Sequence, residues 1–430
     1  MLADRLRARS AHIAVLGLGY AGLPMATELA QAGYLVTGLD TDPERVRLIS
    51  AGQSPVSDVP ASAIAPLVER GRLRATEDFA VLAEVDGAII CVPTPLTPER
   101  RPDLRFVESA ARSIAAHLHP DTLVVLQSTC APGTTRRVVL PLLEASGLRV
   151  GEEFFVAFAP ERIDPGNTRY TVRNTPKLVG GITPRCTELA ALLFAPVVEQ
   201  VVPVSSPEVA ELSKLVENTF RFINISFINE VALLCDRLGI SIWEVIEAAS
   251  TKPFAFMPHY PGPGVGGHCI PIVPFYLEAV AREHGMVAEL IEVAGRINDT
   301  MPVFVVGKLE RLLAERGKRL AEARVLLLGM AYKPDVNDTR ESPSLRVLER
   351  LLACGAQVGY HDPYVPYVRC GGRLLHSLGM EELVTQRFDC AVLLTAHSAV
   401  DYEAIGRQVG FVFDTRNALP ALQSAPVLRF

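Results

Sequence analysis

A glycine-rich turn near the N-terminus restricts the fold of this chain more than any other feature. The apolar run 12–16 leads into Gly17-Leu18-Gly19-Tyr-Ala-Gly22 and then into a helical pattern. A second apolar strand, 35–39, ends at Asp40, 18 residues beyond Gly22. This order is typical of a parallel α/β fold in which the glycines approach a dinucleotide pyrophosphate and the acid holds the ribose hydroxyls. An acid at that position would repel a 2′-phosphate, so NAD is favoured over NADP.

Three further strands are predicted to end in polar residues. The run 87–92 leads to Thr94, the run 123–127 leads to Ser128-Thr129, and the run 153–159 closes on Pro160-Glu161-Arg162. Ligands of open parallel sheets gather beyond the carboxyl ends of the strands, so Thr94 and Thr129 are candidates for cofactor contact. A Glu at a strand end is more often a solvated loop residue. Arg45, just after Asp40, either contacts the cofactor or is a solvated helix residue.

Composition excludes several classes of protein. The chain has 430 residues, 49% hydrophobic and 21% charged, which describes a globular protein of two or three domains. The net charge of −6 and the lack of a Lys/Arg block argue against a nucleic-acid partner. The longest apolar runs fall short of the roughly 18–20 residues of a membrane span. The Arg-rich stretch 1–10 lacks the apolar core of a secretory signal, so we expect a cytoplasmic protein without membrane attachment.

The cysteines point to one residue of interest. Eight are scattered along the chain without a CxxC pair, so neither disulfides nor a metal site is expected. Cys269 ends the loop Tyr260-Pro-Gly262-Pro-Gly264-Val-Gly266-Gly-His268-Cys269, where glycines let the backbone press against a ligand. Taken alone, such a loop is more often a surface turn with a buried, inert cysteine.

A long helix is predicted in the middle of the chain. Ser206-Pro207-Glu208 combines a capping hydroxyl, a first-turn proline and an acid, and no helix breaker follows before Gly239. Such a helix would be about 48 Å long. Lys214, Asn218 and Arg221 share one face of it. That triplet is either an exposed polar stripe or, if the helix is buried between domains or subunits, a set that needs partners.

The last third of the chain restarts the α/β pattern. Apolar strands are predicted at 323–329, 358–362, 390–395 and 411–414, without a second GxGxxG turn, so this part should bind a different ligand. Lys333 and Arg340 follow its first strand. The fold class is therefore α/β, with two Rossmann-like, doubly wound domains joined by a long central helix and a cleft between them. The predicted divisions are an NAD-binding domain at 1–204, a central helical domain at 205–300 and a C-terminal domain at 301–430.

With these motifs assembled, the whole chain resembles the nucleotide-sugar 6-dehydrogenases, the superfamily of UDP-glucose and UDP-N-acetylhexosamine dehydrogenases. The matching segments are Gly17-x-Gly19-x-x-Gly22, Val92-Pro-Thr-Pro95, Ser128-Thr129-x-x-Pro132-Gly133-Thr134-Thr135, Pro160-Glu161-Arg162, Lys214-x-x-x-Asn218, Gly262-Pro-Gly-Val-Gly-Gly-His-Cys269 and Lys333-Pro-x-x-x-Asp-x-Arg340-Glu-Ser-Pro343. The segments 161–167 and 253–264 look most like the bacterial UDP-N-acetyl-D-glucosamine 6-dehydrogenases of surface-polysaccharide synthesis. The UDP-N-acetylmannosamine branch also carries a Gly-Gly-His-Cys loop and is the close alternative.

The resemblance implies a site. NAD is held by Gly17, Leu18, Gly19, Gly22, Asp40, Arg45, Thr94, Thr129 and Arg340. Cys269 is the nucleophile that carries the sugar C6 through a thiohemiacetal and a thioester, with Lys214 and Asn218 as donors and Glu161 and Thr129 at the hydrolytic water. The UDP-sugar is met by Glu161, Arg162, Lys214, Asn218, Arg221, Tyr260, Gly262, Gly264, Gly266, His268 and Lys333. The resemblance also implies a homodimer or higher homo-oligomer built around the long helix.

One position departs from the family pattern. The family commonly has an Asp four residues after the catalytic cysteine, and this chain has Val273 there. Either Glu161 serves the hydrolytic water unaided, or hydrolysis is impaired. Two other functions stay open beside the leading one: a UDP-glucose or GDP-mannose dehydrogenase, and a nucleotide-sugar-binding protein that has lost turnover.

Overall fold

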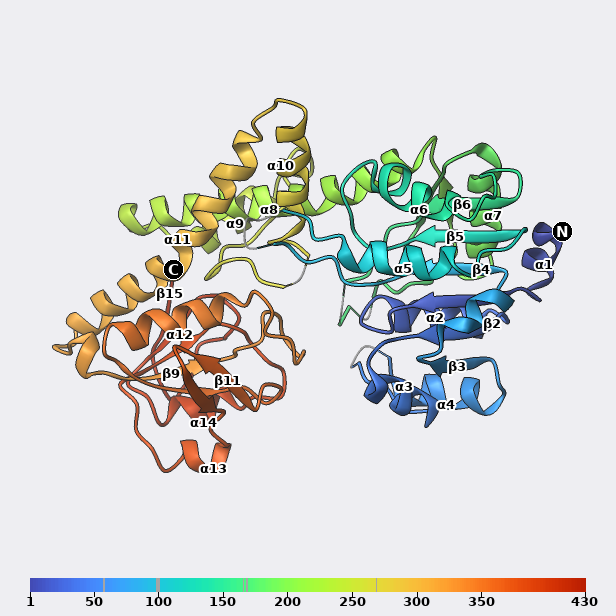
Figure 1. Ribbon diagram of the computed structural model, residues 1–430. Helices are drawn as coiled ribbons and strands as arrows, with labels where there is room; N and C mark the ends of the chain where they lie inside the picture. Colours follow the sequence, from blue (N-terminus) through green and yellow to red (C-terminus); the bar gives the residue numbers. More distant parts are fainter. Residues whose placement is uncertain (57–58, 98–100, 165, 168, 268) are drawn as a thin grey trace. The chain divides into compact units, whose positions relative to one another are not determined.

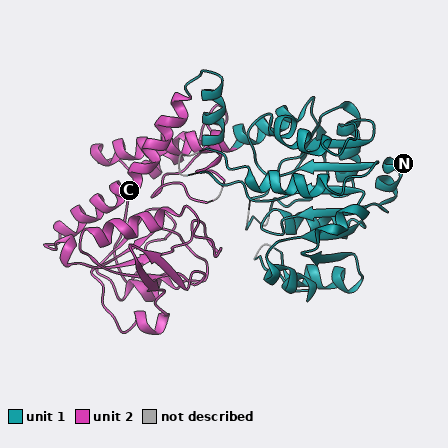
Figure 2. Ribbon diagram, in the orientation of Figure 1, with its two compact units in different colours: residues 1–217, 275–287 teal, residues 218–274, 288–430 magenta. Residues whose placement is uncertain are grey.

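The computed structural model describes residues 1–56, 59–97, 101–164, 166–167, 169–267 and 269–430. The chain forms two compact units (Figure 2). Unit 1 is Met1–Glu217 with Phe275–Val287, and unit 2 is Asn218–Pro274 with Ala288–Phe430. The long helix begins in unit 1 and ends in unit 2. The three-part division at 204 and 300 stays a prediction.

Unit 1 is built on an eight-stranded sheet in the order β3-β2-β1-β4-β5-β6-β7-β8 (Figure 1). The strands from β3 to β6 in this order are parallel to one another, whereas β7 runs antiparallel to β6 and β8 runs parallel to β7. The strands are β1 (His12–Leu16), β2 (Leu35–Leu39), β3 (Leu73–Thr76), β4 (Gly87–Ile90), β5 (Thr122–Leu126), β6 (Phe154–Phe158), β7 (Lys177–Gly181) and β8 (Val201–Pro203). The order 3-2-1-4-5-6 is that of a dinucleotide-binding sheet, as predicted.

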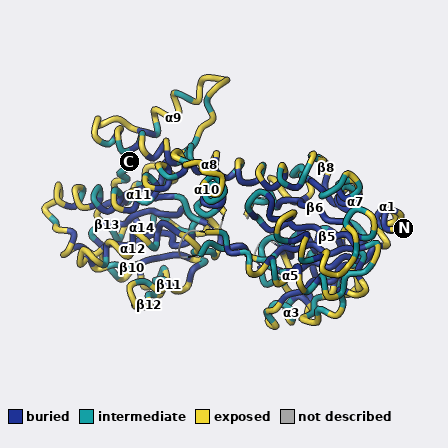
Figure 3. The backbone as a smooth tube through the Cα atoms, turned by 45° about the horizontal axis from the view of Figure 1, so that its top comes forward, coloured by how far each residue is buried: buried dark blue, intermediate teal, exposed yellow. Residues whose placement is uncertain are grey.

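Both faces of this sheet are covered by helices. Along β1, Ile13 and Val15 join one hydrophobic cluster, whereas Ala14 and Leu16 join another. This alternation buries the central strands completely, so they appear as continuous apolar runs in the sequence (Figure 3). The helices are α1 (Leu2–Ala8), α2 (Gly22–Gln31), α3 (Pro43–Ser50), α4 (Ala61–Glu69) and α7 (Pro184–Phe194) on the first cluster, with α5 (Arg105–Ala115) and α6 (Leu140–Glu144) on the second.

Unit 2 contains a second sheet, entirely parallel, in the order β10-β9-β13-β14-β15. Its strands are β9 (Arg324–Leu328), β10 (Gln357–His361), β13 (Cys390–Leu393), β14 (Val412–Asp414) and β15 (Val427–Arg429), with a hairpin of β11 (Tyr367–Cys370) and β12 (Arg373–His376). Its helices are α9 (Ile242–Ser250), α11 (Glu289–Ala314), α12 (Pro343–Ala353), α13 (Met380–Leu383) and α14 (Tyr402–Gly406). Helix α10 (Val273–Glu283) lies mostly in unit 1. The predicted fold class is confirmed.

Helix α8 (Pro207–Leu238) has 32 residues and the predicted bounds. The Ser206 hydroxyl accepts the N–H of Val209 at 3.4 Å, and Gly239, with φ of 68°, follows its last residue. Over the described residues, no helix, α8 included, has the length and apolar character needed to cross a bilayer.

Candidate active site

The three glycines of the turn between β1 and α2 have different local surroundings. Gly17 has φ of 92°, and a Cβ there would lie 2.7 Å from the carbonyl oxygen of Cys91. A Cβ on Gly22 would lie 1.8 Å from the carbonyl oxygen of Gly17. A Cβ on Gly19 would meet no heavy atom of the described residues within 4 Å. Gly17 and Gly22 are thus required for packing, whereas Gly19 leaves open space at the start of α2, where a pyrophosphate can approach the helix N-terminus.

Asp40 shapes the same turn from the end of β2. Its carboxylate accepts the N–H groups of Leu18 at 2.8 Å and Asp42 at 2.9 Å, and it is 6% exposed. Arg45 lies against it, with an Nη1–Oδ2 distance of 3.3 Å. Thr94 is buried, and its carbonyl oxygen accepts the hydroxyl of Tyr276. The open turn and the acid fit NAD.

Glu161 is held by donors on both carboxylate oxygens. Oε1 accepts the N–H groups of Arg162 at 2.7 Å and Ile163 at 2.9 Å. Oε2 accepts Nε2 of Gln127 at 2.7 Å and lies 3.6 Å from Nζ of Lys177. The side chain is 17% exposed, so it is fixed in orientation yet reachable. The alternative that Glu161 is an ordinary solvated loop residue is therefore wrong.

Lys214 lies on α8 and is 7% exposed. Its ammonium group has no hydrogen bond or ion pair with the described residues, unlike that of Lys177. Burial lowers the pKa of Lys177, and the charge of Lys214 lowers it further, whereas Glu161 raises it. Lys214, Lys177 and Glu161 are therefore electrostatic neighbours in unit 1.

Arg162 is committed to structural contacts. Its guanidinium pairs with the carboxylate of Glu217 at 2.7 Å and donates to the carbonyl oxygen of Pro176 at 2.8 Å. These contacts tie the end of β6 to α8. They favour a structural role over the UDP-sugar contact that the resemblance implies.

The turn that carries Thr129 is anchored to α8 by Glu211, which is fully buried. Glu211 accepts the N–H and hydroxyl of Thr135, at 2.8 and 2.7 Å, and the N–H of Gly133. The thiol of Cys130 lies 3.6 Å from the same carboxylate. Burial raises the pKa of both Glu211 and Cys130. Cys130 thus packs beneath the turn, and Thr129, partly buried, is at its surface.

In unit 2 the loop that ends at Cys269 is held by hydrogen bonds from its backbone N–H groups to residues outside the loop. The N–H of Gly262 donates to Asn229 at 3.0 Å, that of Val265 to Asn298 at 2.6 Å, and that of Gly267 to the carbonyl oxygen of Arg340 at 3.1 Å. Cys269 itself is exposed. These three N–H groups are paired within the protein. Any contact between the loop backbone and a phosphate must therefore come from the other N–H groups of the loop.

Close packing accounts for two of the predicted loop glycines. A Cβ on Gly266 would lie 2.8 Å from Pro343, and one on Gly262 would lie 2.5 Å from Nη1 of Arg416. Arg416, which sequence reasoning missed, donates from Nε to the carbonyl oxygen of Leu394 at 2.9 Å. Burial lowers its pKa to about 10. No polar partner of its Nη groups occurs among the described residues, so an anion could be met there.

The remaining predicted residues have varied surroundings. Asn218 is 6% exposed, and its Nδ2 has no partner among the described residues. Arg221 is exposed, so the predicted polar triplet of α8 is only partly buried. Tyr260 is 59% exposed and stacks on Trp243. Arg340 forms a bidentate pair with the carboxylate of Asp338. Lys333 is half-buried, and the backbone of Gly264 has φ of 129°. His268 lies outside the described residues.

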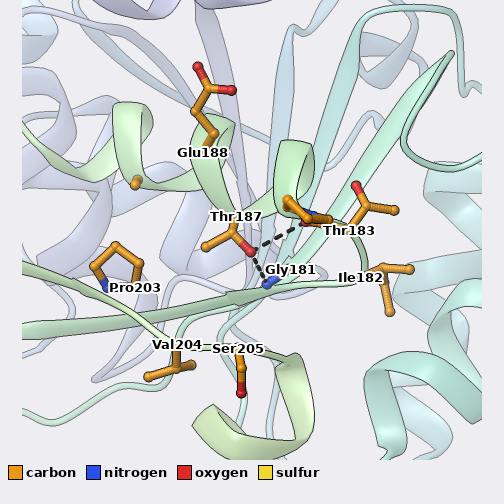
Figure 4. A pocket seen from close by; sticks show the side chains of 10 residues that line it. Gly181, Ile182, Thr183, Thr187, Glu188, Pro203, Val204 and Ser205 are labelled. Carbon is orange, nitrogen blue, oxygen red and sulfur yellow. Dashed lines mark hydrogen bonds between the residues drawn. The ribbon is translucent and has the colours of Figure 1, made fainter.

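A surface pocket of about 390 Å³ lies apart from these residues in unit 1 (Figure 4). It is formed around the start of α7 and the strands β7 and β8. Thr187 accepts the N–H of Gly181 at 2.9 Å and donates to the carbonyl oxygen of Thr183 at 3.3 Å. None of the predicted site residues lines it.

Comparison with known proteins places the whole chain in one family. Three domain models of the UDP-glucose/GDP-mannose dehydrogenase family match this chain: the NAD binding domain at residues 11–198, the central domain at 208–300 and the UDP binding domain at 326–421. The UDP-N-acetyl-D-mannosamine dehydrogenase of Pyrococcus horikoshii is 36% identical, over 95% of this chain and 96% of that protein. The UDP-N-acetyl-D-glucosamine 6-dehydrogenase of Pseudomonas aeruginosa is 36% identical, over 90% of each.

A solved structure agrees. That of the UDP-D-ManNAc dehydrogenase from Pyrococcus horikoshii superposes with a TM-score of 0.87 at 34% identity and covers 97% of this chain and 98% of that one. The predicted family, enzyme class and NAD cofactor are confirmed. The chain therefore belongs to the UDP-glucose/GDP-mannose dehydrogenase family and is an NAD-dependent UDP-sugar dehydrogenase.

Proposed function

We propose that the protein oxidises the C6 alcohol of a UDP-N-acetylhexosamine, with UDP-N-acetyl-D-glucosamine as the best candidate, to the uronate for surface-polysaccharide precursor synthesis. The observation that carries the proposal is the exposed Cys269 on a glycine loop held in place by Asn229 and Asn298. The relatives named for UDP-N-acetyl-D-glucosamine and UDP-N-acetyl-D-mannosamine support the substrate class. UDP-N-acetyl-D-mannosamine is the second candidate because several relatives carry that name.

The proposed chemistry uses the thiol as a covalent handle. NAD, when bound, accepts the hydride that leaves C6 in each of the two oxidations. The Cys269 sulfur adds to the C6 aldehyde as a thiohemiacetal, so the aldehyde is not released between steps. Oxidation of that adduct gives a thioester, which water cleaves to the carboxylate and free thiol. In both covalent intermediates the Cys269 sulfur is bonded to C6 of the sugar.

Four other residues act on the same carbon or its oxygen. Lys214, which has no salt-bridge partner among the described residues, is suited to help deprotonate the alcohol or to stabilise the developing oxyanion. Asn218, whose Nδ2 has no hydrogen-bond partner over the described ranges, supplies a second donor one turn along α8. Glu161, fixed by its donors, orients the hydrolytic water together with the Thr129 hydroxyl. The UDP phosphates are met by Lys333 and by the Nη groups of Arg416, which have no polar partner in the part of the chain that the structure describes.

Val273 gives no help at the hydrolytic step. It is the first residue of α10, 2% exposed, and its side chain has neither donor nor acceptor. We therefore assign the water step to Glu161 without a second carboxylate at position 273. The competing function, a binding protein that has lost turnover, draws its support from this residue alone.

The stoichiometry of NADH tests the proposal. Purified protein is supplied with UDP-N-acetyl-D-glucosamine, UDP-N-acetyl-D-mannosamine, UDP-glucose or GDP-mannose, and NADH and sugar product are quantified. We expect about two NADH per sugar, since an alcohol becomes an acid. One NADH per sugar would mean that oxidation stops at the aldehyde level. Binding of UDP-sugar without NADH would favour the binding protein.

The covalent mechanism has its own test. Cys269→Ser retains the size of the side chain but removes the thiolate, so we expect loss of acid formation with UDP-sugar binding retained. Product and binding are measured by mass spectrometry and calorimetry. Cys354→Ser, at another exposed cysteine, is the control and should behave as the wild type. Full acid production by Cys269→Ser would rule out the thioester route.

A further inference from the structure

A buried lysine outside the predicted site lies next to Glu161. Lys177 is the first residue of β7 and is 4% exposed. Because β7 runs antiparallel to β6, with Phe158 opposite Gly180, the start of β7 extends beyond the carboxyl end of β6. Lys177 therefore lies at the sheet edge where Gln127 follows β5 and Glu161 follows β6.

These three side chains form a chain of polar contacts. Nζ of Lys177 lies 3.0 Å from Oε1 of Gln127 and 3.6 Å from Oε2 of Glu161. Nε2 of Gln127 donates to that same Oε2 at 2.7 Å. The stem of Lys177 reaches this position past Phe194, whose ring centroid is 5.3 Å from Nζ.

The chemistry of the groups permits one orientation of the Gln127 amide. An ammonium group only donates and a carboxylate only accepts, so the amide oxygen must face Lys177 and the amide nitrogen must face Glu161. A rotated amide would place its oxygen against the carboxylate and its N–H₂ against the ammonium. Gln127 is 1% exposed, so its amide cannot exchange either contact for bulk water. Lys177 thereby determines how Gln127 holds Glu161.

We propose that Lys177 and Gln127 are positioning residues that hold Glu161 in place for hydrolysis of the Cys269 thioester. The inference rests on the proposed function. In that step a bond forms between the water oxygen and C6, and the C6–Sγ bond breaks with its electron pair returning to Cys269 as a thiolate. One water proton passes to the Glu161 carboxylate, and there is no net oxidation. The hydride-transfer steps do not need Glu161 and therefore do not need Lys177.

The proposal separates the formation of the thioester from its cleavage. Lys177→Met should retain a burst of about two NADH per active site, because both oxidations precede hydrolysis. Turnover after the burst should slow about 100-fold, the loss expected when a catalytic group is misplaced by about 1 Å. Intact-mass measurement during that phase should show a sugar-nucleotide acyl group on Cys269.

Companion variants separate positioning from folding. Gln127→Met should give the same burst and adduct, and Lys177→Arg, which restores a buried cation, should recover part of the turnover with less adduct. Lys308→Met is the matched control: Lys308 pairs with Asp236 at 2.7 Å, both are 14% exposed, and neither belongs to the site. Loss of that pair should lower the melting temperature without a burst or an adduct. If Lys177→Met does not fold, Gln127→Met and Lys177→Arg decide by the same measurements.

Failure of the inference differs from failure of the proposed function. If the wild type makes no NADH from any of the nucleotide sugars, the proposed function is wrong and the inference falls with it. If the wild type turns over and a folded Lys177→Met variant does so at the same rate without adduct, the inference alone is wrong. A folded variant that lacks the NADH burst would place Lys177 before thioester formation and would also overturn it.

Discussion

At the scale of single residues, the glycines of the dinucleotide turn make separable contributions to folding and binding. A methyl group at Gly22 would overlap the carbonyl oxygen of Gly17, which belongs to the backbone and cannot rotate away. A methyl group at Gly19 would extend into space that no described atom fills. One position is therefore constrained by the protein itself and the other by what approaches it.

This difference predicts that replacement by alanine has different consequences at the two glycines. Gly22→Ala should destabilise the protein by about 1–3 kcal/mol, as overpacking does. Gly19→Ala should leave the free energy of unfolding unchanged or raise it by up to about 1 kcal/mol, yet weaken NAD binding at least about tenfold. Denaturant unfolding and calorimetric titration with NAD check the pair. Equal NAD affinity of Gly19→Ala and wild type would mean that the pyrophosphate does not approach Gly19.

The sequence was sufficient to identify residues whose roles are indicated by a local sequence pattern. Asp40 and the glycine turn stand at fixed spacing, and Cys269 ends a loop of unusual composition. Arg416 and Lys177 carry no such signal, because each follows or begins an ordinary apolar strand. Their importance depends on which strands are neighbours and on strand direction, which only the folded sheets define. Gln127 offered one local clue: it directly precedes the Ser128-Thr129 turn at a strand end.

At the scale of elements, α8 was predictable in full because its start and stop are both local. Ser206, Pro207 and Gly239 mark the ends, and the helix has the predicted bounds. The direction of strand β7 could not be predicted, because an apolar run in a sequence does not reveal whether the strand lies parallel or antiparallel to β6. That direction places Lys177 beside Glu161.

The first turn of α8 supports a prediction about pH. Glu208 pairs with Arg136 at 2.6 Å, and this contact lowers the pKa of Glu208 from 4.5 to about 2. A lowered pKa means stability that is present above pH 4.5 and lost as the pH falls towards 2. Since Glu208 is about one-third exposed and Arg136 more so, solvent screening reduces the expected effect to about 1 kcal/mol.

Glu208→Gln should therefore be less stable than the wild type by about 1 kcal/mol at pH 7, and the difference should shrink as the pH falls below about 4.5. Urea unfolding at a series of pH values measures this difference. A double-mutant cycle with Arg136→Met isolates the pair from the favourable placement of an acid in the first helical turn. A difference that stays constant down to pH 3 would show that the charge of Glu208 is not responsible.

At the scale of the whole molecule, α8 leaves apolar side chains uncovered. Those that are at least 40% exposed recur at helical spacing along its length: Val209, Leu212, Val216, Phe220, Phe227, Leu234 and Leu238. An apolar stripe of this extent on a single helix is typical of a surface that packs against another chain. It supports the predicted homodimer, in which the helix of a second copy would cover it.

A charge in the stripe tests that assembly. Phe227 is 57% exposed, so Phe227→Asp should not disturb the fold of one chain, but it would bury a carboxylate in a helix–helix interface. We expect the variant to be monomeric in light scattering at concentrations where the wild type is a dimer. Phe106→Asp is the matched control, because Phe106 is 46% exposed and lies on α5 rather than on α8. A Phe227→Asp variant that keeps the dimer mass would show that the stripe is not the dimer interface, and a wild type that is already monomeric would contradict the dimer.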